Sequence, residues 1–237
     1  MQQEGRIFKM RHDAAAPERS GAEPFSIEAL VNGLSPVRPM RLRDGMMLSL
    51  AAVLVAAIAV ALSMGVRQDL AAGNPHWMFV LRAAVLVVLG LAAAKAALSA
   101  ATPGVGNSSP AAWKWLLAGA VLFPGGAAYV WLTEPVQTMA RANLLLYPEY
   151  GLECLRISGV CAAVVAVVLT LWVRRGAPTS PNQAAWLIGL AAGALGAAAY
   201  SIHCTQNVLI YIGTWYSLAV AGCALAGRII LPRFLRW

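Results

Sequence analysis

The sequence predicts an all-α polytopic membrane protein, a bundle of six transmembrane helices with a short cytoplasmic N-terminal helix. Composition is the first observation: 59% of the 237 residues are apolar and only 12% are charged, whereas about a quarter of a soluble domain is charged. The second observation is a mean hydropathy of +0.66. The third is a set of long apolar runs. These runs are continuous, which excludes the alternating strands of a transmembrane barrel.

Residues 1–45 precede the first apolar run and mix acidic with basic side chains, which is not the pattern of a secretory signal peptide. Residues 1–22 are polar and contain scattered Ala and Pro, so we expect a disordered cytoplasmic leader. Residues 23–45 follow as a short cytoplasmic helix and a basic juxtamembrane segment. Apolar side chains recur in that helix at helical spacing and form one stripe, made of Ile27, Leu30, Val31 and Leu34.

This stripe needs a surface to cover it, because an isolated helix of about ten residues is marginal in water. One candidate is the lipid headgroup layer, since basic residues follow at Arg38, Arg41 and Arg43. The other is an apolar groove on a cytoplasmic protein. The residues alone leave both open.

Six apolar stretches are long enough to cross a bilayer, at about 20 residues each. They cover residues 46–65, 77–101, 113–132, 154–173, 184–203 and 208–227. Together they predict a transmembrane domain over 46–227 and a C-terminal tail over 228–237. An even number of spans places both termini on the same side of the membrane.

Positive charge indicates which side that is, because Lys and Arg in short flanking segments resist translocation. Basic residues concentrate in the N-terminal 45 residues, at Arg174 and Arg175, and after residue 227. We therefore expect both termini in the cytoplasm. The opposite face holds Arg67, Arg141 and Arg156 together with several acidic residues.

Charged and aromatic residues inside the spans have structural interpretations. Arg82 and Lys95 lie near opposite ends of the second span, so we expect both to snorkel towards water, with a functional contact as the less favoured alternative. Trp215 falls within the sixth span. We expect it to pack against the fifth span, where small residues at Gly189, Gly193 and Ala197 permit close approach.

No motif predicts catalysis. The chain contains no phosphate-binding GxxxxGK[ST] loop, HExxH, GxSxG or CxxC motif, and its spans contain no acidic cluster. We therefore expect no enzyme activity, no constitutive cofactor, no small-molecule substrate and no direct nucleic-acid binding. A small transporter or channel subunit is a weaker alternative, because the spans are almost entirely Ala, Val, Leu and Gly. A membrane thiol oxidoreductase is weaker still, because it ordinarily needs a second relaying thiol pair.

Four cysteines are the remaining reactive side chains. Cys161 and Cys223 lie within spans, where free Cys behaves as a small apolar residue. Cys154 and Cys204 are expected at the outer membrane surface, where thiols oxidise and soft metals arrive. Glu153 and His203 adjoin them and are candidate supporting ligands. A functional thiol pair, a static disulfide and two unpaired thiols all remain possible at this stage.

Several segments resemble one family. The sequences ECLR (153–156), RRGAPTSPNQAAWLIGLAAGALGAAAYSIHC (174–204), WY (215–216) and LPRFLRW (231–237) are similar to those of NrsF-type negative regulators of extracytoplasmic-function (ECF) sigma factors. The segment ALVNGLSPVRPMR (29–41) resembles the family's start, although the leader 1–22 is longer than expected. The resemblance covers about residues 25–237 and implies a six-span anti-sigma factor of the bacterial inner membrane.

The resemblance also implies a mechanism for a stress-responsive transcription regulator. The N-terminal segment would hold an ECF sigma factor at the membrane, through Ile27, Leu30, Val31, Leu34, Pro36, Val37 and Arg38. The family's two cysteines are matched by Cys154 and Cys204, which would sense a heavy metal or an oxidant. A heavy-metal ion bound transiently by these two thiolates would then be the signal that releases the sigma factor.

Overall fold

The computed structural model describes residues 41–101, 121, 124–126, 128–129, 132–133, 148–176, 178 and 180–235. All regular elements among these residues are helices. The all-α prediction is therefore confirmed for the described part of the chain. The predicted N-terminal helix and residues 1–40 as a whole lie outside it.

The first described helices are α2 (Leu42–Met64), the single turn α3 (Gln68–Ala71) and α4 (Trp77–Ala100). Asp44 lies in the first turn of α2, where the helix dipole favours a carboxylate. The helix α2 ends at Gly65, whose φ of 84° suits a residue without a side chain. At the start of α4, the His76 side chain accepts a hydrogen bond from the Met78 backbone N–H (3.2 Å).

The next two helices are α7 (Pro148–Arg174) and α8 (Pro181–Tyr200). Each begins with a proline, which suits the first helical position because its missing N–H has no helical partner there. After Tyr200 the chain turns and continues without helix through residues 204–208. The last helices are α9 (Leu209–Tyr211), the π-helical segment η2 (Ile212–Tyr216), α10 (Ser217–Ile230) and α11 (Pro232–Leu235).

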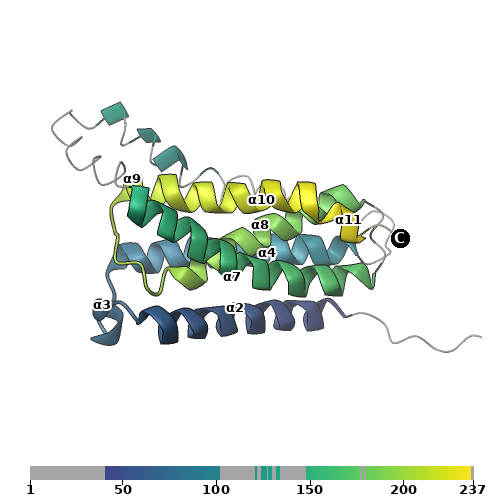
Figure 1. Ribbon diagram of the computed structural model, residues 1–237, viewed down its shortest axis with the longest axis horizontal. Coiled ribbons are helices and arrows are strands. Elements are labelled where there is room, and N and C mark those ends of the chain that lie inside the picture. The colour runs from purple at the N-terminus through teal and green to yellow at the C-terminus, as the bar shows by residue number, and fades with distance from the viewer. Residues whose placement is uncertain are drawn as a thin grey trace, which may run out of the picture. The chain divides into compact units, whose positions relative to one another are not determined.

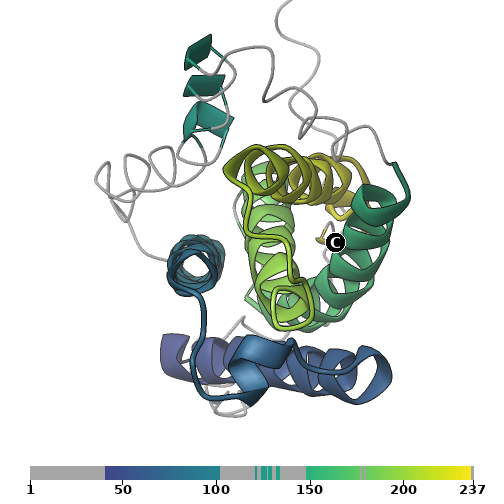
Figure 2. The ribbon, with the colours of Figure 1, turned by 90° about the vertical axis from the view of Figure 1, so that its left-hand side faces the viewer.

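The helix α8 lies at the centre of the described bundle. It contacts α2, α4, α7 and α10, and Figures 1 and 2 show its neighbours gathered around it. The most apolar stretch of α8 is 89% buried, against 28% for α2. The central position explains why α8 is made almost wholly of Ala, Gly and Leu, because small residues allow neighbouring helices to approach closely.

Glycines permit these close contacts. A Cβ atom at Gly193 would lie 2.8 Å from the Cβ of Cys223 in α10, and one at Gly196 would lie 2.7 Å from the Ser158 carbonyl oxygen in α7. The predicted small-residue face of the fifth span therefore does receive the sixth. The predicted place of Trp215 is wrong, however: its indole packs over Gly151 of α7. The π-helical turn shifts the register of the last helix there, which hydropathy does not reveal.

Five helices in the described residues are long and apolar enough to cross a membrane: Leu42–Met64, Trp77–Ala100, Glu149–Arg174, Pro181–Tyr200 and Leu209–Ile230. They match five of the six predicted spans. The remaining predicted span, 113–132, which is the third in chain order, lies mostly outside the described residues. The observed helices also extend beyond or stop short of the predicted limits. For example, α7 begins at Pro148 rather than at 154, and α8 ends at Tyr200 rather than at 203.

Candidate functional site

The candidate site lies at one end of the described bundle, where the loop 65–76 meets the turn 201–208. We call this the polar end. The loop follows α2 and the turn follows α8, so both positions are set by where these helices stop. The N-terminus of α7 and the π-helical segment η2 also reach this end (Figure 1).

The two predicted sensing thiols are buried at the polar end. Cys154 of α7 has no exposed surface and Cys204 of the turn is 5% exposed. Both side chains belong to one cluster of buried residues. All four cysteines of the chain are described, and all are free thiols. Cys154 lies more than a turn inside α7, although it was expected at the very start of its span.

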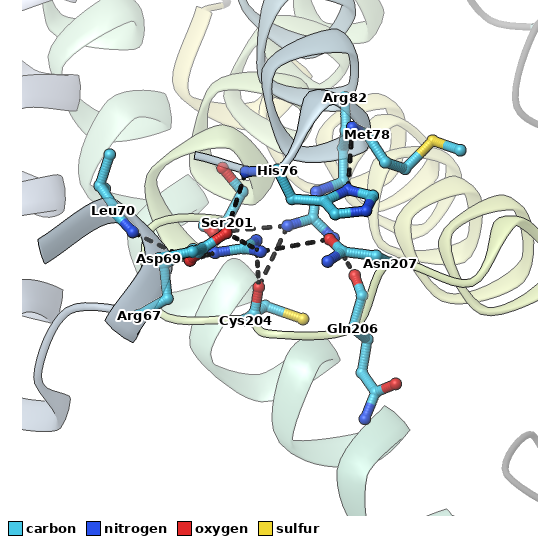
Figure 3. A network of polar contacts seen from close by, with 10 residues as sticks. All are labelled: Arg67, Asp69, Leu70, His76, Met78, Arg82, Ser201, Cys204, Gln206 and Asn207. Atoms are coloured by element: carbon cyan, nitrogen blue, oxygen red, sulfur yellow. Dashed lines mark hydrogen bonds and ion pairs between the residues drawn. The ribbon is translucent and has the colours of Figure 1, made fainter. Parts of the chain in front are cut away.

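A fully buried arginine contacts the turn that carries Cys204. Arg82 of α4 donates from Nη1 to the carbonyl oxygen of Gln206 (2.7 Å) and from Nη2 to those of Cys204 (3.2 Å) and Ser201 (3.4 Å). Its guanidinium carbon lies 4.8 Å from the centre of the Tyr216 ring. The hydrogen bonds connect α4 to the turn, as Figure 3 shows, and the ring contact connects α4 to η2.

The prediction that Arg82 snorkels to water is therefore wrong. The chain leaves α8 at residue 200, so several carbonyls of the turn have no backbone donor among the described residues. A buried carbonyl needs a hydrogen-bond donor, and a guanidinium supplies several at once. Lys95, the other charged residue of α4, has no such acceptors in the described structure and is exposed.

A second arginine joins the loop to the turn. Arg67 is 4% exposed and binds both carboxylate oxygens of Asp69 (2.5 and 2.7 Å). It also donates from Nη1 to the Cys204 carbonyl (2.9 Å) and from Nη2 to Oδ1 of Asn207 (3.3 Å). The Cys204 carbonyl thus accepts from both Arg67 and Arg82, as Figure 3 shows.

Asp69 is held as an anion by this network. The hydrogen bonds from the Arg67 side chain lower the pKa of the Asp69 carboxyl well below its usual range, against the opposing effect of burial. Backbone N–H groups of His76 and Leu70 act in the same direction. The loop 65–76 therefore has a fixed polar core at neutral pH.

An open depression with a volume of about 860 Å³ borders the network. Its lining includes Arg67, Asp69 and His76, and also His203 and Thr205 of the turn. The last two flank Cys204 in the chain. The open depression therefore reaches both chain neighbours of the buried Cys204.

The predicted supporting residues do not join the thiols in one ligand set. Glu153 is exposed, and Nδ1 of His203 lies 3.1 Å from the Gly65 carbonyl oxygen. Among the described residues, no three His, Cys, Asp or Glu side chains are arranged to hold a metal ion.

Sequence reasoning missed Arg67 and Tyr216 as members of this site, and placed Arg82 outside it. The useful signal was the polar sequence CTQN (204–207), which begins shortly after α8 ends, because it implies carbonyls that need donors. Two buried groups here, Nε of Arg82 and the Tyr216 hydroxyl, have no hydrogen-bond partner within the described structure. Such groups are uncommon in proteins, and each calls for an explanation such as an ordered water, strain or a functional role. The predicted sigma-factor contacts Ile27, Leu30, Val31, Leu34, Pro36, Val37 and Arg38 lie outside the described residues.

Comparison with known proteins identifies the family. A family described as "Negative regulator of sigma F", NrsF, matches residues 30–237. The anti-sigma-F factor NrsF of Caulobacter vibrioides is 30% identical over 210 residues, which are 86% of this chain and 92% of that protein. A probable anti-sigma-F factor NrsF of Azospira oryzae is 34% identical over 101 residues, 43% of this chain and 47% of that protein. No solved structure is significantly similar to the chain. The family match covers most of the sequence, and the chain therefore belongs to the NrsF family of negative regulators of sigma F.

Proposed function

We propose that this protein is an anti-sigma factor of the bacterial inner membrane that sequesters an ECF sigma factor and releases it when Cys154 and Cys204 meet a heavy metal or an oxidant. The curated relatives are named anti-sigma-F factors, which supports a sigma factor as the partner. One structural observation supports the sensing step above all: two free thiols belong to one cluster of buried residues, and an open depression reaches the chain neighbours of Cys204.

The proposed topology has six spans with both termini in the cytoplasm. The distribution of Lys and Arg supports it, since the basic termini and Arg174–Arg175 would then all lie inside. The polar end would face the periplasm. The start of α2, which follows the proposed sigma-binding segment 23–39, would face the cytoplasm.

The chemistry at the thiols balances in either form of the signal. A soft divalent cation would bind two thiolates, and the two thiol protons would pass to water. A two-electron oxidant would instead take two electrons and two protons as the sulfurs form a disulfide. To change the sigma factor from almost fully bound to almost fully released, the signal must bind the releasing state about 5.5 kcal/mol more tightly than the sigma-binding state. Coordination by thiolates supplies energy on that scale.

Sequestration is tested by capture of the ECF sigma factors of the source bacterium. The full chain and a variant lacking residues 23–39 are purified from membranes, and each is mixed with these sigma factors. We expect capture by the full chain and at least about a tenfold loss of affinity for the deletion, since the apolar stripe would be absent. Equal capture by both would place the interface elsewhere. Failure of the folded full chain to bind would refute sequestration.

Sensing is tested on the captured complex. Addition of Cd²⁺ is expected to release the sigma factor from the wild-type chain but not from a Cys154→Ser, Cys204→Ser double variant. A Cys161→Ser, Cys223→Ser variant is the matched control and is expected to respond as the wild type does. Full release from the first double variant would refute the thiol switch and leave sequestration intact.

A further inference from the structure

The turn that carries Cys204 is joined directly to the end of α2. The Arg67 backbone N–H donates to the Ile202 carbonyl (3.1 Å), and its Nη1 donates to the Cys204 carbonyl (2.9 Å). Nδ1 of His203 lies 3.1 Å from the Gly65 carbonyl oxygen, a contact that requires the proton on Nδ1. Three consecutive residues of the turn thus contact the segment that immediately follows α2.

The Arg67 side chain is held rigidly in this position. Asp69 binds it through both carboxylate oxygens, and the ring of Phe79 lies 4.8 Å from its guanidinium carbon. The side chain is buried and fixed on two sides, unlike a mobile surface charge. A bidentate ion pair of this kind fixes geometry as well as supplying energy.

The helix α2 connects this contact to the opposite end of the bundle. It runs without a break from Leu42 to Met64, about 35 Å of helix. It is the least buried of the spanning helices that the structure describes, so fewer packing contacts oppose its movement. Packed helices shift as rigid elements, so a displacement at Gly65 reaches Leu42. Residue 42 follows directly on the segment 23–41 of the chain.

The state of the Cys204 side chain affects the same contact. Its own carbonyl is the acceptor that Arg67 and Arg82 share. Bonding of Cys204 Sγ to a metal or to a second sulfur changes the side-chain direction at residue 204. Cys204 itself is buried, so its side chain has little room for this change without movement of the backbone at residue 204. A reaction at the Cys204 thiol is therefore expected to disturb the hydrogen bond from Arg67 to the Cys204 carbonyl.

We propose that Arg67 is the positioning residue that couples Cys204 to α2: its bond to the Cys204 carbonyl holds α2 in the sigma-binding position while the thiols are free, and the signal breaks that bond. The inference rests on the proposed anti-sigma function. It also predicts the effect of losing the Arg67 contact: the sigma factor is released, as it is when the signal binds.

The test measures sigma-factor capture by the solubilised full chain without any challenge. Arg67→Leu is expected to weaken capture about tenfold, the scale of one lost hydrogen bond from a charged donor. The same loss is expected in the Cys154→Ser, Cys204→Ser background, because the variant acts after the thiols. Arg156→Leu makes the same change at an exposed arginine of α7 and is expected to capture as the wild type does.

Folding is controlled in two ways. Each variant must elute as a single monodisperse peak on size-exclusion chromatography. Arg67→Lys keeps a cation beside Asp69 and so preserves the loop, but one ammonium lacks the planar fork that serves Asp69 and the Cys204 carbonyl together. If Arg67→Leu does not fold, Arg67→Lys serves as the test instead, and it is expected to show the same loss of sigma-factor capture. If folded Arg67 variants captured the sigma factor as well as the wild type does, the proposed coupling through Arg67 would be refuted and the proposed anti-sigma function would stand. Absence of capture by the wild type itself would refute the proposed function instead.

Discussion

At the scale of single residues, Arg82 is the side chain on which the polar end depends most. Replacing it by Leu removes the side-chain donor of the Ser201 and Gln206 carbonyls and leaves Arg67 as the donor to the Cys204 carbonyl. We expect Arg82→Leu to lower the free energy of unfolding by about 2–4 kcal/mol, since unsatisfied buried polar groups each cost about 1–3 kcal/mol. Lys95→Leu removes an exposed cation from the same helix and should change stability by less than about 0.5 kcal/mol.

Unfolding of both variants in a denaturing detergent series measures this difference. Equal stability of the two variants would mean that water replaces Arg82 as the donor. The sequence showed that Arg82 lies within the span but not where its side chain points, because the accepting carbonyls come from a turn more than a hundred positions away. Hydropathy carries no information on that contact. Snorkelling was therefore the wrong expectation for Arg82.

Asp69 gives the polar end a defined dependence on pH. Its pKa is lowered in the folded state, so the Arg67–Asp69 pair stabilises the fold at pH above the unfolded value, about 3.9. This contribution is lost as pH falls below about 4 towards the lower folded pKa. Thermal midpoints of the wild type and of Asp69→Asn are expected to differ by a constant amount from pH 5 to 7 and to converge in acid. A difference that grows as pH falls would contradict this assignment.

At the scale of helices, the contact of α7 with α8 depends on Gly196. A Cβ there would lie 2.7 Å from the Ser158 carbonyl oxygen and 2.8 Å from the Ala162 Cα, both part of the backbone. We expect Gly196→Ala to destabilise the protein by about 1–3 kcal/mol, the usual cost of overpacking. Gly222→Ala is the matched control, because a Cβ at Gly222 meets no atom within 4 Å.

The same detergent unfolding assay distinguishes these two glycines. Tolerance of Ala at position 196 would show that α7 can move away from α8 at little cost. The sequence predicted a small-residue face on α8 correctly, since Gly189, Gly193 and Ala197 recur at one spacing. It did not predict that Gly196 and Gly193 face different neighbours, because which helix lies on which side is a property of the three-dimensional arrangement.

At the scale of the whole molecule, hydropathy predicted five spanning helices that the structure contains, since burial in lipid requires long apolar runs. It placed their ends less well. After α8 ends, Arg82 donates hydrogen bonds to the carbonyls of the turn. The register of the last helix depends on the π-helical segment Ile212–Tyr216. The thiols Cys154 and Cys204 were expected at one height on the membrane surface, and the structure places both in one cluster of buried residues in the protein interior.

The orientation in the membrane follows from charge and is open to direct test. Asn74 lies exposed at the polar end, and Arg175 lies exposed after α7 at the other end. With the native cysteines replaced by Ser, we expect Asn74→Cys to react with a membrane-impermeant maleimide once the outer membrane is permeable, whereas Arg175→Cys reacts only after the inner membrane is opened. The reverse pattern would place the Cys204 turn in the cytoplasm, and thiols that face the reducing cytosol would not report on the periplasm. The sensing proposal requires the expected pattern, because the signal and the sigma factor must then act on opposite sides and α2 must carry the change between them.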